Sequence, residues 1–320
     1  MSKPYNTIEK QIEILQSRGL VINDINFAKK ILLTENYYSI INGYKDLFVD
    51  EDNNFSEGTV FCDIYALYSF DRELRNFLIG HLLKFENIIK SVLTNYFCSE
   101  YSDEDMPYLN FKNFDKTMNN RTFTIAKLIS TFTNTIQQEE KKRGAVYHYL
   151  IEYDHVPLWV LKNFMTFGNI QWMYFFVKQS IKDKIARYFA EEYQSNYNEN
   201  HFFSDETILS ILKTTNFFRN ICAHEERLYN FRIYRRPSTT QIASILGIGG
   251  NLLLEGNMFT LVASLKLVMN KSDYELFILG LQELFIKYEN SFNSIEFRTV
   301  ISTMGLPENW DTILVGQHQN

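Results

Sequence analysis

The chain has 320 residues, of which 45% are apolar and 22% are charged, a composition typical of a globular protein with one or two domains. The formal net charge of −6 excludes a protein that coats nucleic acid indiscriminately, so any contact with phosphates must come from a local basic patch. Three widely separated cysteines argue against a disulfide framework. The amphipathic N-terminal residues and the lack of a long apolar run predict a cytoplasmic protein that does not enter a membrane.

Helices dominate the predicted secondary structure, because only 5 prolines and 13 glycines interrupt the chain. Capping residues and apolar residues at three- and four-residue spacing predict the helices in chain order. They run from Thr7 to Gly19, from Asn23 or Asp24 past Ile31, from Asn36 to Gly43, from about Val60 to Phe97, from about Thr122 to Gln138, from Pro157 through Phe164, around Trp172 to Phe175, from Ile181 to Tyr193, and from Ser204 or Asp205 into residues 219–227.

Polar segments near residues 50–58, 103–120 and 195–203 are predicted loops, and Thr166 to Asn169 is a predicted break. Weaker helical patterns follow near 258–269, 272–288 and 294–302. No segment alternates as a strand does, so the predicted fold class is all-α. We expect an N-terminal helical region over 1–58, a helical core over 59–236 with an inserted segment near 100–150, and a C-terminal helical extension over 237–320.

Residues 219–227, which read Arg-Asn-Ile-Cys-Ala-His-Glu-Glu-Arg, are the most informative stretch. Their histidine carries protons near neutral pH, and a fixed cation stands five positions before it. These groups are sufficient to break a phosphodiester without a metal. His224 acts as general acid and base, Arg219 stabilises the charge that develops on the phosphate, and Asn220 hydrogen-bonds one of them. The 2′-hydroxyl of RNA supplies the nucleophile, so the stretch predicts cleavage of RNA and not of DNA.

We expect an unbroken helix through this stretch. Asn220, His224 and Arg227 then share one face, whereas Arg219 points about 140° away from His224. An arginine is long enough to fold round the edge of a helix. It is also able to act on a phosphate that is held by the other subunit of a symmetric dimer.

Arginines outnumber acidic residues between positions 219 and 236, and aromatic residues are interleaved with them. This mixture suits phosphates and stacked bases. It predicts RNA-binding or supporting roles for Arg227, Arg232, Arg235, Arg236 and Tyr229. A solvated helix face has the same composition, and spacing alone leaves that interpretation open.

Three further polar residues leave a functional and a structural interpretation open. Glu86 precedes Lys90 by four positions, which predicts an i,i+4 salt bridge, but an acid here could instead orient Arg219 or His224. Arg75 is interpreted either as a surface partner of a nearby acid or as part of an extended RNA-binding surface. His81 falls in an apolar stripe and is interpreted as a hydrogen-bonded core residue.

Other residues with reactive or aromatic side chains have plainer explanations. The histidines and cysteines lack the spacing of metal ligands, so we expect neither a metal nor another cofactor. Cys222 is interpreted as a small buried residue within the motif. Trp159 and Trp172 are expected to be packing residues, because they stand among apolar neighbours.

The Arg-Asn-x-x-Ala-His run resembles the signature of HEPN-domain ribonucleases, in which four to six residues separate an arginine from a following histidine. The wider chain is similar to the Abi family of bacterial abortive-infection proteins, in the AbiD/AbiF-like group. Lys90 stands where that family often has arginine, which leaves a bidentate pair with Glu86 open. The similarity rests on stretches in order along nearly the whole chain: Lys3-Pro4-Tyr5, Asn36-Tyr37-Tyr38, Phe70 to Arg75, Phe85-Glu86, Pro157-Leu158-Trp159, Thr166-Phe167-Gly168, Arg219 to His224, Arg227 to Asn230, and Met304 to Pro307 with Trp310.

This resemblance implies a HEPN-like helical bundle with N-terminal helices and a C-terminal helical extension. It also implies a homodimer that brings two arginine–histidine motifs together, metal-independent RNA cleavage that leaves a 2′,3′-cyclic phosphate, and a toxin of phage defence restrained by a noncoding RNA antitoxin. Two other hypotheses stay open. One is a non-catalytic module that binds RNA or a nucleotide, and the other is a scaffold whose aromatic helices bind a protein.

Overall fold

The computed structural model describes residues 5–117 and 121–315. Lys3 and Pro4 of the family-like stretches, residues 118–120 of the predicted loop and the outermost residues of the two terminal regions lie outside the described part. Within it the chain is all-α, as predicted, with no strand and only isolated β-bridges such as Val21 with Val60. None of the described helices has both the length and the apolar character that crossing a membrane requires.

The N-terminal region forms the short helices that its capping residues predict. Helix α1 covers Ile8–Ser17 and helix α2 covers Ile25–Thr34. The Thr7 hydroxyl accepts from the backbone N–H of Lys10 at 3.3 Å, and the Asp24 carboxylate caps α2. A π-helical turn, η1, follows at Tyr38–Asn42, and a 3-10 turn, η2, at Lys45–Leu47.

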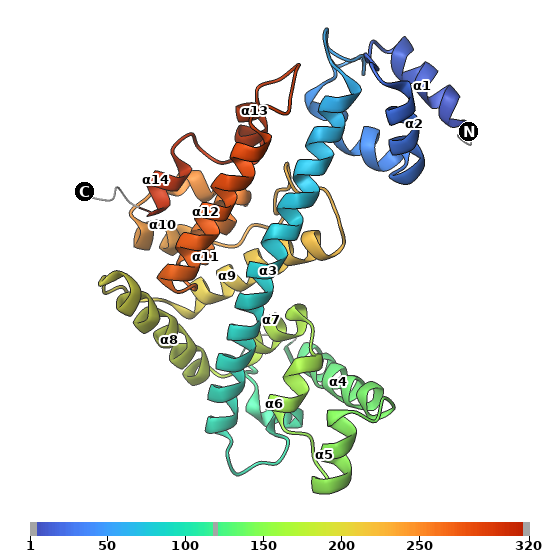
Figure 1. Cartoon of the computed structure of the whole chain (residues 1–320). Helices are drawn as coiled ribbons and strands as arrows, with labels where there is room; N and C mark the ends of the chain where they lie inside the picture. The colour runs from blue at the N-terminus through green and yellow to red at the C-terminus, as the bar shows by residue number, and fades with distance from the viewer. Residues whose placement is uncertain (1–4, 118–120, 316–320) are drawn as a thin grey trace.

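Helix α3 covers Phe61–Glu100 and is the long central helix beside which the other groups of helices lie. Its 40 residues span about 60 Å. In Figure 1 the N-terminal helices lie at one end of α3, helices α4 to α7 lie at the other end, and the C-terminal helices lie along one side. The helix is long because its apolar residues recur every three or four positions along its whole length. The fully buried ones are Ile64, Leu67, Phe70, Leu74, Leu78, Leu82, Ile89, Leu93 and Phe97.

The segment after α3 packs around its far end. The 3-10 turns η3 and η4 cover Pro107–Leu109 and Phe111–Asn113, and they precede α4 (Arg121–Glu140), α5 (Ala145–Tyr153), α6 (Leu158–Leu161), η5 (Lys162–Phe164), α7 (Phe167–Phe176) and α8 (Gln179–Tyr197). The predicted break at 166–169 is only a cap. The Thr166 hydroxyl accepts from the backbone N–H of Asn169 at 3.2 Å, so α7 begins directly after it. Helix α5 was not among the predicted helices.

The C-terminal part consists of α10 (Thr240–Leu246), η6 (Gly250–Leu253), α11 (Met258–Lys266), α12 (Lys271–Tyr288), α13 (Phe297–Thr303) and α14 (Trp310–Val315). Helix α11 is buried on all sides from Met258 to Leu265, because it carries apolar or small residues around its whole circumference. The predicted patterns near 258–269 and 272–288 correspond to α11 and α12. Helices α10 and α14 were not among the predicted helices.

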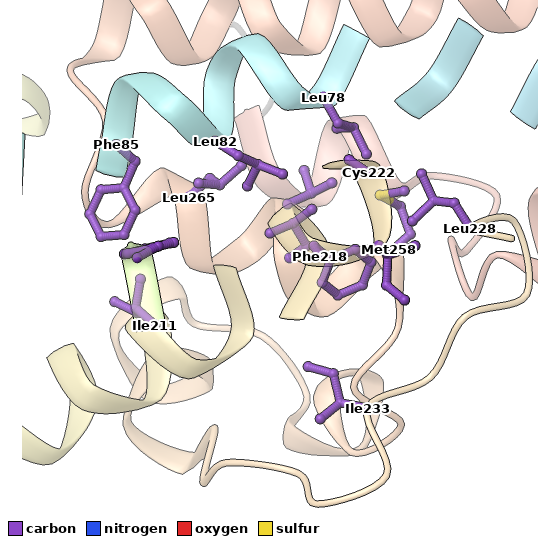
Figure 2. Packing of buried hydrophobic residues seen from close by; sticks show 14 of the residues in the cluster. Leu78, Leu82, Phe85, Ile211, Phe218, Cys222, Leu228, Ile233, Met258 and Leu265 are labelled. Carbon is purple, nitrogen blue, oxygen red and sulfur yellow. The ribbon is translucent and has the colours of Figure 1, made fainter. Parts of the chain in front are cut away.

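Helix α9, Asp205–Ala223, lies between α3 and α11 and contacts both. Figure 2 shows Phe218 and Cys222 of α9 in the packed region between Leu78 of α3 and Met258 of α11. Burying an apolar side chain of this size stabilises the fold by about 1.5–3 kcal/mol. Because one side of α9 is fixed by this core, the residues on its other side are held in defined positions at the surface.

Candidate active site at the end of helix α9

Helix α9 ends inside the predicted motif. Its last residue is Ala223, and His224 is the C-cap. The backbone N–H of Glu225 donates to the Cys222 carbonyl at 3.4 Å, and that of Glu226 donates to the Ile221 carbonyl at 3.0 Å. With Glu225 at φ +55°, this is a Schellman motif in which the left-handed position lacks its usual glycine. The expected unbroken helix through residues 219–227 is therefore wrong, and Arg227 does not share a helix face with His224.

Asp71 of α3 gives the physical reason why the chain turns here. Its carboxylate accepts from the backbone N–H groups of Leu228 at 3.0 Å and Tyr229 at 2.6 Å, and from the Tyr44 hydroxyl at 2.7 Å. A continued helix would not present those two N–H groups to α3. Turning also buries Leu228 and Tyr229, which are 2% and 1% exposed. By ending α9 here, the chain loses the hydrogen bonds of one further helical turn but gains apolar contacts and buried hydrogen bonds with α3.

Arg75 completes this buried network. Its guanidinium forms an ion pair with Asp71 and donates to the Tyr44 hydroxyl and the Glu226 carbonyl, both at 3.2 Å. Desolvation raises the pKa of Asp71, whereas Arg75 and the donors from the backbone and Tyr44 act in the opposite direction. The sequence was right that Arg75 pairs with a nearby acid but wrong to place the pair on the surface, since Arg75 is 4% exposed. A buried Arg75 does not extend an RNA-binding surface. The signal was present: Asp71 and Arg75 lie on the same helical stripe as the buried Leu74 and Leu78.

Glu86 joins the predicted arginine to α3. Its Oε2 accepts from Nε of Arg219 at 3.2 Å, and its Oε1 lies 2.7 Å from Nζ of Lys90. The side chains of Glu86, Lys90 and Arg219 are 5%, 10% and 26% exposed. Both alternatives from the sequence are therefore present together, because Glu86 forms the salt bridge within α3 and also orients Arg219. Each cation contacts a different oxygen of the carboxylate.

His224 stands apart from this cluster. Its side chain is exposed, and it makes no hydrogen bond or ion pair with any described residue. Five helical positions separate it from Arg219, which corresponds to a rotation of about 140° around the axis of α9. Asn220 is exposed as well, and its amide donates to Asn216 at 3.4 Å rather than to His224. A single chain thus orients Arg219 and exposes His224, but no described contact joins the two.

Three of the four arginines from Arg227 to Arg236 are held by structural partners. Arg227 donates to the Gly43 carbonyl at 2.7 Å and pairs with Asp46 at 2.8 Å. Arg232 pairs with Glu255 at 3.2 Å and donates to the Thr303 carbonyl at 2.7 Å. Arg236 donates to the Leu254 carbonyl at 2.8 Å. Arg235 is exposed, and no described residue forms a hydrogen bond or ion pair with its side chain.

Tyr229 and Cys222 lie in the interior. The Tyr229 ring stacks on Tyr44 with centroids 5.8 Å apart, so it supports the turn and does not offer a face for stacking on a base. Cys222 is 7% exposed, in agreement with its interpretation as a small buried residue. Burial raises the pKa of its thiol to about 12, so at neutral pH it is not a nucleophile.

His81 is also a structural residue. Its ring lies between Phe77 and Phe277, with centroid distances of 4.8 and 5.0 Å. It packs against aromatic rings and has no hydrogen bond to any described residue, which differs from the expected hydrogen-bonded core histidine. Desolvation and the nearby Lys84 lower the pKa of the ring. Arg75 and His81 also form an arginine–histidine pair, with five residues between them, but the two side chains lie in separate packed environments.

Comparison with known proteins adds one positive finding. A model of the family described as Abi-like protein matches residues 30–230, which include η1, all of α3 and the whole of α9 with the turn after it. No curated protein and no solved structure matches the chain.

Proposed function

The chain belongs to the family of Abi-like proteins, and from this membership we propose that it is a metal-independent endoribonuclease toxin. The family suggests a role in abortive-infection phage defence. The finer proposal is a HEPN-type enzyme of the AbiD/AbiF-like group, which acts in the cytoplasm as a homodimer and cleaves RNA.

One observation carries this proposal. His224 is the C-cap of α9, and its exposed imidazole has no side-chain partner among the described residues, while Arg219 of the same helix is oriented by the buried carboxylate of Glu86. A proton carrier needs a ring that the substrate can reach, and His224 has one. A group that stabilises charge must be fixed before the reaction, and Glu86 fixes Arg219.

The chemistry follows from these two groups. Neutral His224 removes the proton from the 2′-hydroxyl of RNA, whose oxygen attacks the adjacent phosphorus. The bond from phosphorus to the 5′-oxygen breaks, and a protonated His224 gives that oxygen its proton. The products are a 2′,3′-cyclic phosphate and a free 5′-hydroxyl. Arg219 stabilises the extra negative charge of the transition state.

The two groups would meet across two copies of the chain. Because Arg219 and His224 point about 140° apart around α9, a phosphate that contacts both within one chain would have to bridge the side of the helix. A symmetric dimer with the ends of two α9 helices face to face instead brings each His224 toward the Arg219 of the other copy. Each of the two equivalent sites then holds one Arg219 and one His224, and that single imidazole acts first as base and then as acid.

The direct test incubates the purified protein with single-stranded RNA in EDTA. We expect cleavage to 2′,3′-cyclic phosphate ends, and we expect His224→Ala to lose at least about 100-fold in rate, the contribution of general acid–base catalysis. Equal cleavage by His224→Ala, or cleavage that requires a divalent ion, would refute the assignment. His201→Ala is a matched control, since His201 is a histidine outside the motif.

A second candidate function is a non-catalytic module that binds RNA. The separation of Arg219 from His224 in one chain favours it, because binding needs no convergence of the two groups. It predicts that RNA copurifies with the protein and stays intact, and that toxicity in cells survives the loss of both side chains. Cleaved ends that disappear in His224→Ala would eliminate it.

We also propose that a noncoding RNA restrains the toxin. An inhibitor RNA would occupy the same cationic surface as the substrate, so it should compete with substrate for the protein. A short structured RNA gene beside this one, whose transcript blocks cleavage by the purified protein, is the expected finding. Cells that tolerate the protein after that gene is deleted would contradict the proposal.

A further inference from the structure

Two cations share the carboxylate of one residue of α3, and a third cation lies near one of them. Arg219 and Lys90 contact the two oxygens of Glu86 at 3.2 and 2.7 Å. Nζ of Lys162, on η5, donates to the hydroxyl of Ser91 at 2.6 Å, and Ser91 is the residue after Lys90. Glu86 is therefore the carboxylate partner of two cations, whereas no carboxylate of a described residue pairs with Lys162, in a protein whose formal net charge is −6.

The lysines are close enough to repel each other. Partial burial lowers the pKa of Lys162, and the positive charge of Lys90 lowers it further. Lys90 is held by Glu86, whereas Lys162 donates to a neutral hydroxyl, which leaves other donors of its ammonium group available. An anion bound to Lys162 would relieve this repulsion.

An exposed aromatic ring stands beside Lys162. Trp159 of α6 is 55% exposed, so its expected packing role is wrong. It precedes Lys162 by three positions across the junction of α6 and η5, and residues at this spacing lie on the same side of a helix. Proteins bind single-stranded nucleic acid by combining cations that contact the phosphates with exposed aromatic rings that stack on the bases. Lys162 and Trp159 provide one of each.

We propose that Lys162 and Trp159 form a binding site for the RNA strand beside the cleaved bond, in which the ammonium group of Lys162 holds a backbone phosphate and the indole stacks on an adjoining base. The positive charge of the nearby Lys90 strengthens the attraction for the phosphate. The strand extends from Arg219 along α3 to η5. The site selects single strands, because only an unpaired base exposes its face to the indole. This inference rests on the proposed function only in taking RNA as the ligand.

The test measures the affinity of full-length His224→Ala protein for a labelled single-stranded RNA oligonucleotide at several salt concentrations. Each phosphate that a protein neutralises contributes about 0.7 to the slope of log affinity against log salt for a single strand. In this background, Lys162→Ala should reduce the magnitude of the slope by about 0.7. Trp159→Ala should weaken binding several-fold and leave the slope unchanged, because stacking releases no counterion.

The controls are Lys30→Ala and Tyr38→Ala, which remove an exposed lysine and an exposed tyrosine from the opposite end of α3. Neither should change affinity or slope. A second arm adds inorganic phosphate at constant ionic strength and records the melting temperature. A larger rise for the parent than for Lys162→Ala, together with an RNA slope that Lys162→Ala leaves unchanged, would assign the site to free phosphate and would overturn the proposal.

The inference is also overturned if the slope of Lys162→Ala equals that of its background, or if Trp159→Ala and Tyr38→Ala bind equally well. Neither result depends on cleavage, because the background lacks His224. Conversely, a protein that binds through this site but whose parent form cleaves nothing would refute the proposed enzyme and leave the binding site standing.

Discussion

Glu86 is the residue whose loss should be most costly at the site. It is the carboxylate partner of Lys90, whose side chain is 10% exposed, and it also orients Arg219. Glu86→Gln keeps the shape but leaves a nearly buried ammonium group without its counter-charge. We expect the free energy of unfolding to fall by about 3 kcal/mol, measured by urea denaturation, and the rate of RNA cleavage to fall with it.

The matched control for this change is Glu13→Gln. Glu13 pairs with Lys10 on the surface, where the two side chains are 64% and 58% exposed. Exposed pairs contribute about 0–1 kcal/mol, so the control should be close to the parent. Equal stability of the two variants would mean that the Glu86 cluster does not hold the site together.

His81 gives a prediction about pH. Desolvation first, and then Lys84, lower the pKa of its ring below the ordinary value of about 6.5. As the pH falls through that value, the unfolded chain takes up a proton before the folded protein does, so stability is lost until the folded ring also titrates. We expect His81→Leu to weaken this acid-side loss of stability. Urea unfolding of both proteins at about pH 7.5 and about pH 5.5 measures it, and an identical loss in both would contradict the prediction.

The end of α9 is the element that sets the position of His224. Glu225 takes the left-handed conformation that glycine adopts without strain. We therefore expect Glu225→Gly to raise the free energy of unfolding by about 0.5–1 kcal/mol. The neighbouring Ala223→Gly should lower it by up to about 1 kcal/mol, because Ala223 is still helical. Thermal unfolding of the two variants decides the matter, and the same sign for both would contradict this account of the turn.

The sequence predicts where several helices begin, but it misses where α9 ends. Thr7, Asp24 and Ser204 act as N-caps as expected, because a cap depends on residues only a few positions away. The end of α9 was missed because it is set by Asp71, far away along the chain. Local propensity favoured a continued helix, and buried partners on α3 overrode it.

At the candidate site, too, the sequence predicts contacts within one helix but not contacts between distant elements. The pairing of Glu86 with Lys90 follows from their spacing in one helix. The exposure of Trp159 does not, because apolar neighbours in the sequence do not reveal which face of a short helix is covered. Nor does the burial of Tyr229, which depends on a ring 185 positions earlier, at Tyr44. Spacing and composition do not predict which distant elements will contact each other.

For the whole molecule, the arrangement around α3 joins the N-terminal region to the motif. Tyr44 hydrogen-bonds Asp71, and Arg227 pairs with Asp46, so the residue before η2 and a residue within it are tied to the turn that follows His224. Glu86, further along the same helix, orients Arg219. One long helix thus fixes both halves of the candidate site, although the two halves do not meet within one chain.

The most direct measurement of the central claim mixes two inactive variants, Arg219→Ala and His224→Ala, and follows RNA cleavage in EDTA. A site shared between two copies is complete in one half of each mixed dimer. Cleavage should then return to roughly a quarter of the parent rate once the copies exchange freely. A mixture as inactive as either variant alone, beside an active parent, would contradict a site that two copies build together.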